Sequence, residues 1–246
     1  MKKYMWLLLL AGVLVLAQTA RAQEEEPEFT STFELDDCIW SNVGGNEYFN
    51  LDPGTQSVLE GEDDGEDLVL QITALNAYKT ISFRTPEGDK VKVKARVVEE
   101  REWVDDELVE VSRNFFARCR QTNDIYYFGE DVDIFEDGMV SHDGAWLAGK
   151  NGAQPGLIMP GTFLLGSRYF QEIAPGVALD RAEHTAMGLT VQVPFGVLDE
   201  CVEIVETSPL DAPGHSSTKV YCSDVGLVID SEAELTEHHS RNDDDD

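Results

Sequence analysis

The chain has 246 residues, of which 48 are acidic and 18 basic, and its formal net charge at pH 7 is −30. Such a charge repels the phosphates of nucleic acids and of anionic lipids, so neither is expected as a partner. The length is sufficient for one sizeable hydrophobic core.

The first 22 residues are typical of a secretory signal peptide. Lys2 and Lys3 precede an apolar run over 5–17, and Ala20 and Ala22 occupy the two positions that a signal peptidase reads. The run is short for crossing a bilayer, so an uncleaved anchor is the less favoured alternative. We predict export to the periplasm or the cell exterior, with no membrane insertion after cleavage.

Acidic segments without hydrophobic periodicity flank the rest of the chain. They cover 23–37, which contains QEEEPEFTSTFELDD, and 231–246, which ends in four aspartates. Such segments cannot bury enough apolar surface to offset the entropy of ordering, so a disordered leader and a disordered tail are predicted. One β domain over 38–230 remains between them.

Alternation of apolar and polar residues predicts the strands. In KVKVKARVVE (90–99) apolar residues alternate with basic ones from Lys90 to Arg96, as in a strand with one wet face. The segment 108–119 has a similar alternation, and the acidic turn WVDDE connects the two segments, which predicts a hairpin. Further strands are predicted in 67–83 and, paired by short turns, in 124–142, 188–206 and 219–222.

Only the segment from Ala178 to Met187 is compatible with a short helix, and a strand fits it nearly as well. The expected fold is therefore all-β. An antiparallel meander of about ten strands would close into a barrel or a strongly curved two-sheet sandwich, because closure removes exposed edges. The uncharged, Gly- and Pro-rich segment 144–166 is expected to be a loop that packs over the barrel mouth or lines a pocket.

An even number of cysteines in an exported chain predicts two disulfides, for which three connectivities exist. We favour Cys201–Cys222, because both residues are about equally far from the centre of a predicted hairpin loop at Asp211 and Ala212. Cys38 and Cys119 would form the other bond. No CxxC motif or Cys/His cluster favours zinc.

The stretch NDIYYFGEDVDIFEDG (123–138) contains six carboxylates and four aromatic residues. The stretch does not match the ligand spacing of an EF-hand loop. On a strand, Asp131 and Asp133 would share the face opposite Val132. An acid-coated surface hairpin is the preferred interpretation. A calcium site formed by Glu130, Asp131 and Asp133 is the alternative, and no other cofactor is expected.

Catalytic motifs are scarce in this sequence. It lacks the GxSxG turn of serine hydrolases and the HExxH motif of zinc proteases. His142 lies beside Asp143 and Asp180 precedes His184, so either histidine could be oriented by a carboxylate and act as a base. A glycosidase needs only two carboxylates about 5–10 Å apart, which so acidic a chain could supply anywhere.

The central third of the chain resembles a family of uncharacterised exported bacterial proteins. The resemblance rests on YYFGED, SHDGAWLAG, PGLIMPG and QEIAPGVALD, with LDPGTQSVLEG earlier and SPLDAPG later in the chain. It implies a shared all-β fold and export, but no activity, because none is established for the family. Because the resemblance is densest in this block, a site is expected where its polar and aromatic residues meet, namely Tyr126, Glu130, Asp131, Asp133, His142, Asp143, Trp146 and Glu172.

Together these observations predict a non-catalytic binding protein that holds a small ligand or a divalent cation such as calcium. Two alternatives stay open. One is a hydrolase that uses a carboxylate pair or a His–carboxylate pair. The other is an acidic envelope or matrix component that has no site. Whether the protein is an enzyme is not decided by the sequence.

Overall fold

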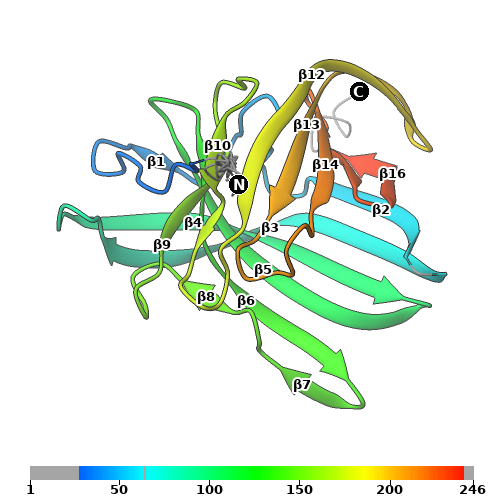
Figure 1. Ribbon diagram of the computed structural model, residues 1–246, viewed down its shortest axis with the longest axis horizontal. Helices are drawn as coiled ribbons and strands as arrows, with labels where there is room; N and C mark the ends of the chain where they lie inside the picture. Colours follow the sequence, from blue (N-terminus) through cyan, green and yellow to red (C-terminus); the bar gives the residue numbers. More distant parts are fainter. Residues whose placement is uncertain (1–27, 64, 241–246) are drawn as a thin grey trace, which may run out of the picture.

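The computed structural model describes residues 28–63 and 65–240 and is built from β-strands (Figure 1). Among the described residues there is no helix that could cross a membrane. The strands are β1 Trp40–Ser41, β2 Gln56–Asp63, β3 Glu66–Arg84, β4 Lys90–Val104, β5 Glu107–Cys119, β6 Ile125–Glu136, β7 Met139–Ser141, β8 Trp146–Leu147, β9 Gln154–Met159, β10 Arg168–Phe170, β11 Glu172–Ile173, β12 Arg181–Val193, β13 Gly196–Thr207, β14 Ser217–Cys222, β15 Gly226–Asp230 and β16 Ala233–His239.

Antiparallel pairing joins these strands into one curved sheet. Its order is β10-β12-β13-β14-β15-β16-β2-β3-β4-β5-β6-β9-β11, and β1, β7 and β8 pair at its sides. The two end strands, β10 and β11, are separated in the chain only by Gln171. The sheet therefore nearly closes into a barrel, which confirms the predicted all-β fold.

Both predicted disordered ends are partly ordered, and the prediction is wrong there. In the leader, Thr30 pairs with Tyr169 and Leu35 is buried. In the tail, β16 pairs with β15 and with β2 and so forms part of the barrel wall. Alternation in β16 is hidden by its many polar residues, but Ala233 and Leu235 on its inner side are fully buried. The predicted signal peptide and the residues 23–27 and 241–246 lie outside the described part of the chain.

The predicted 90–99 and 108–119 hairpin forms as β4 and β5, but one of its predicted wet residues is buried. Lys90, Lys92 and Lys94 are exposed, whereas Arg96 is only 4% exposed. Opposite Arg96, β3 bulges between Ala74 and Tyr78, which frees backbone carbonyls from the ladder. Arg96 donates to the carbonyls of Leu75 at 2.9 Å and Ala77 at 3.3 Å, which the bulge leaves open, and to the carbonyl of Asn42 at 2.8 Å.

The segment 178–187 enters strand β12 and contains no helix. The segment 144–166 is not a single loop. Its first part forms β8 and a turn that packs against the outer face of β3, where a Cβ on Gly149 would lie 2.9 Å from the Cβ of Phe83. Its second part is β9, which pairs with β6 in the barrel wall. The prediction of a cover over the barrel mouth is therefore wrong, and only Ile158 of this segment borders a cavity.

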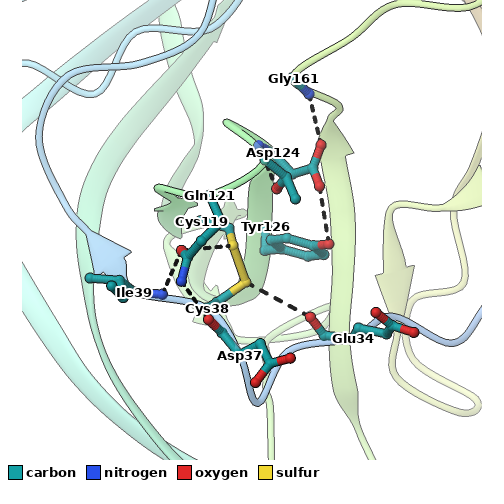
Figure 2. The surroundings of a disulfide bond; sticks show 10 residues. Glu34, Asp37, Cys38, Ile39, Cys119, Gln121, Asp124, Tyr126 and Gly161 are labelled. Atoms are coloured by element: carbon teal, nitrogen blue, oxygen red, sulfur yellow. Dashed lines mark hydrogen bonds between the residues drawn. A yellow bond between two sulfur atoms is a disulfide. The ribbon is translucent and has the colours of Figure 1, made fainter.

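Two disulfide bonds cross-link the fold, and the cysteines pair as the sequence favoured. Cys38–Cys119 ties the N-terminal segment to the end of β5, and Gln121 reinforces it by donating to the carbonyl of Asp37 and accepting from the N–H of Ile39 (Figure 2). Cys201–Cys222 joins directly opposed residues of β13 and β14. Both bonds are consistent with an oxidising environment.

Two apolar clusters make up the core. The larger one packs the N-terminal segment and the turn after β8 around β3–β6 and includes Phe115 and Phe128. The smaller one lies under β2 and β12–β16 and includes Leu59 and Leu235. Between them the inward side chains of the sheet are largely polar, and this is where the interior stays open.

Candidate ligand-binding site

A cavity of about 370 Å³ lies inside the barrel. Side chains from β2 to β6 border one side of it, and residues of β9, β11, β13, β14 and β15, with Asp180 just before β12, border the other. A volume of this size falls in the range of pockets that hold small molecules. Five aromatic residues contribute to its wall: Tyr48, Phe49, Phe116, Tyr127 and Tyr221.

The wall of the cavity is strongly acidic. Lys219 is the only Lys or Arg on it among the described residues, whereas six carboxylic acids border it: Glu100, Glu110, Glu130, Glu172, Asp180 and Glu206. Their side chains keep some accessible surface because they border the cavity, although they lie deep inside the protein. Burying carboxylates is costly unless they are paired or protonated, so this wall does not contribute to stability as an apolar core would.

A bulge in β6 brings two of the wall residues together. On β5 only Phe115 separates Asn114 from Phe116, whereas on β6 Phe128 and Gly129 separate their partners Glu130 and Tyr127. The extra residue places Tyr127 and Glu130 on the same side of the strand, facing the cavity. Phe128, fully buried, faces the apolar cluster on the outer side.

Gly129 is required at this bulge. Its φ is +126°, and a Cβ there would lie 2.4 Å from the carbonyl oxygen of Trp146. We expect Gly129→Ala to lower the free energy of unfolding by about 2 kcal/mol, from backbone strain and from the forced separation of β6 and β8. Urea denaturation measures the loss.

The matched control is Gly138→Ala in the β6–β7 turn, where φ is +74° but no atom lies within 4 Å of the added Cβ. It should cost about 1 kcal/mol, from the left-handed backbone alone. Equal losses in the two variants would show that the close approach of β8 does not constrain the bulge.

Burial raises the pKa of Glu130 to about 7, with hydrogen bonding from Tyr127 opposing the shift and Glu110 adding to it. Burial also raises the pKa of Glu172 well above its ordinary value, and the negative charge of Glu130 adds to this. None of the ion pairs found within the described residues includes Glu130 or Glu172. This part of the wall therefore lacks a compensating positive charge.

The opposite part of the wall is compensated by Lys219. Its Nζ lies 2.8 Å from Asp230 Oδ2 and 3.6 Å from Glu206 Oε2. Burial lowers the pKa of Lys219, but the negative charges of these two acids raise it by more than burial lowers it. The net shift is upward, and the ammonium group stays charged. Burial raises the pKa of Glu100 to about 7, and Lys219 opposes that shift.

The three residues of the predicted calcium site do not converge. Glu130 faces the cavity, whereas Asp131 is 59% exposed and lies 2.7 Å from Lys79 Nζ. Asp133 pairs with Arg113 at 2.9 Å, and hydrogen bonding from Arg113 lowers its pKa. In the described part of the chain no three His, Cys, Asp or Glu side chains are placed to hold a metal ion. The outer face of β6 is thus the acid-coated surface that the sequence favoured.

Of the other predicted site residues, only Glu172 borders the cavity. Trp146 lies behind it: its ring centroid is 5.2 Å from that of Tyr127, and its indole N–H, although close to Glu172, makes no hydrogen bond of normal geometry. Tyr126 packs on the far side of β6 against Trp40.

The histidines do not form a site with the cavity. His142 is 69% exposed and its Nδ1 lies 2.8 Å from the carbonyl of Val132 and 3.1 Å from Asp133, while the neighbouring Asp143 is exposed. His184 is buried, with both nitrogens engaged by Tyr169 and the carbonyl of Leu164. Burial lowers the pKa of His184 to about 4, so it is a neutral structural residue.

Sequence reasoning missed most of the wall, including Glu100, Gln171, Glu206 and Lys219. Glu100, Glu206 and Lys219 lie on strands whose polar residues the alternation assigns to solvent, and Gln171 lies between two short strands. The pattern therefore contains no signal that separates them from surface residues. Comparison with protein-family models, curated proteins and solved structures finds no match to this chain. Function is therefore inferred from the cavity itself.

Proposed function

We propose that this protein binds a small organic ligand inside its barrel, without acting on it chemically. The observation that supports this most is the cavity of about 370 Å³, bordered by five aromatic residues and by ionisable groups. Pockets that bind small molecules combine an apolar wall with a few polar groups that fix orientation. An acidic component without a site would instead direct its acids to solvent, where they stay hydrated.

The proposal includes export. The segment 1–22 has the layout of a cleaved signal peptide, and the two disulfides require an oxidising compartment to persist. A periplasmic or extracellular binding protein fits both features. The resemblance to a family of exported bacterial proteins points the same way.

A cavity-filling variant tests the proposal. Ala74 is buried on β3 and borders the cavity, so Ala74→Trp should occupy the space that a ligand needs. We expect some compounds of a chemically diverse library to raise the melting temperature of the wild type by several degrees at concentrations of about 100 times Kd. The same compounds should leave the melting temperature of Ala74→Trp unchanged.

Ala77→Trp is the matched control, because Ala77 is exposed on the same strand and does not border the cavity. It should respond to ligands as the wild type does. Compounds that stabilise all three proteins equally would bind the surface, and a library that stabilises none of them would remove the support for a binding function. Calcium and magnesium belong in the library, because a divalent cation is the other ligand that the sequence suggests.

A hydrolase is the second candidate, favoured by one observation. Burial and the negative charge of Glu130 raise the pKa of Glu172, and a protonated acid beside an ionised carboxylate is the arrangement that glycoside hydrolysis uses. Conversion of a stabilising compound into product during the same screen would favour this candidate. Recovery of the compound intact favours binding alone.

A further inference from the structure

The cavity contains a second kind of unsatisfied group besides its acids. Gln171 is 2% exposed, and its Nε2 donates to Glu206 Oε1 at 2.7 Å. Gln171 is one of the residues that border the cavity, and its buried Oε1 accepts no hydrogen bond from the described residues. The amide cannot be turned round, because its oxygen would then face the acceptor oxygens of Glu206. A buried acceptor without a donor costs stability and is filled by a ligand or by water.

The backbone places this acceptor next to the uncompensated acids. The N–H groups of Gln171 and Glu172 both donate to the carbonyl of Asp180, at 2.7 and 3.2 Å, so the strand is irregular and both side chains border the cavity. Glu172 lies on β11, and β9 alone separates it from β6, which carries Glu130. A Cβ on Gly156 of β9 would lie 2.1 Å from the Gln171 carbonyl oxygen, so this glycine permits the close approach of the strands.

Gln171, Glu130 and Glu172 therefore border the same cavity, and no Lys or Arg of the described chain is paired to the two carboxylates. The Tyr127 ring lies beside them, and its face attracts positive charge. A ligand with N–H donors and a positive charge would satisfy the acceptor of Gln171 and neutralise the carboxylates together. A neutral or anionic ligand would leave these groups uncompensated.

We infer that the ligand is a small organic cation with N–H donors, bound with its ammonium group between Glu130 and Glu172 and its apolar part against the aromatic wall. This inference rests on the proposed binding function. On the Lys219 side the protein supplies its own cation, which is paired with Glu206 and Asp230. We therefore place the ammonium group of the ligand at Glu130 and Glu172.

The probes are 2-phenylethylamine, tryptamine and cyclohexylmethylamine, each compared with the alcohol of the same skeleton by calorimetric titration at pH 7.5. We expect each amine that binds to do so roughly 10- to 100-fold more tightly than its alcohol, the ratio that a charge-assisted hydrogen bond gives. The trimethylammonium form of 2-phenylethylamine keeps the charge but has no N–H, so it should bind more weakly than the amine.

Glu130→Gln/Glu172→Gln should remove the preference for amine over alcohol while still binding the alcohol. Glu136→Gln, an exposed position at the end of the same strand, should retain the preference. For the wild type, amine affinity should rise at least about tenfold between pH 5 and pH 7.5, because Glu130, whose pKa burial raises to about 7, loses its proton over this range.

Alcohols that bind as tightly as amines, and are blocked by Ala74→Trp, would overturn the cationic ligand but leave the binding function standing. Amines that bind equally well to the Glu130→Gln/Glu172→Gln variant would also overturn the inference. Failure of all three amines to bind would overturn it too, and the library screen then decides the binding function separately.

Discussion

Replacing the pair Cys38→Ala/Cys119→Ala is expected to lower the free energy of unfolding by about 4.5 kcal/mol. The bond closes a loop with a sequence separation of 81, and in the chain-entropy model the stabilisation grows with the logarithm of loop length. The loop also includes Tyr48, Phe49 and Asn50, which border the cavity. Guanidinium denaturation of the variant and of the wild type measures the loss directly.

The second disulfide serves as the matched control. Cys201→Ala/Cys222→Ala opens a loop with a sequence separation of only 21, so the same model gives about 3.3 kcal/mol. This bond joins β13 and β14 within a hairpin that its own ladder already aligns. A larger loss from the short loop than from the long one would contradict the expectation that loop length decides.

Glu130→Gln is expected to stabilise the protein at pH 7.5 by about 3 kcal/mol and to leave it unchanged at pH 4.5. The folded-state pKa of Glu130 is raised by burial to about 7, from 4.5 in the unfolded chain. Between these values the folded state holds a proton that the unfolded state has released, so stability falls as pH rises from 4.5 to 7. A glutamine does not titrate, so the variant does not lose this stability. The expected gain of about 3 kcal/mol follows from about 1.36 kcal/mol per pKa unit.

Urea denaturation at pH 4.5, 6 and 7.5 measures this effect, with Glu136→Gln as the control for the removal of one negative charge from a very acidic chain. Glu136 is exposed, so its substitution should change stability by only a few tenths of a kcal/mol at each pH. If both variants gain the same stability at pH 7.5, the cause is the relief of general charge repulsion. Ionisation of Glu130 in the cavity then carries no cost of its own.

Local patterns in the sequence predicted much of the fold. Alternation between Lys90 and Arg96 predicted β4 and its hairpin partner, and the position of a Pro- and Gly-rich loop predicted which cysteines would face each other across β13 and β14. The acidic surface of β6 followed from the same rule, because Asp131 and Asp133 alternate with Val132. All of these depend on residues close in the chain, whose geometry a strand fixes by itself.

The site could not be predicted in this way. Glu130 stands next to Asp131 in an acidic run, yet Glu130 faces the cavity and Asp131 faces Lys79 and solvent. The bulge at Gly129 places Glu130 on the same side of the strand as Tyr127, facing the interior. The position of the bulge depends on the pairing of β6 with β5. Of the predicted site residues, only Glu130 and Glu172 reach the cavity.

The sequence by itself determined the all-β fold class, the cysteine pairing that we favoured and the acidic character of this protein. Each follows from composition, period-two alternation or spacing within one hairpin. Only the tertiary structure decided that the polar side of β4 and β5 turns inward at Glu100 and Ser112, and that Gln171 and Lys219 face it from across the barrel. The physical reason is curvature: alternation assigns a residue to one face of a sheet, but closure of the sheet decides whether that face meets solvent or a cavity.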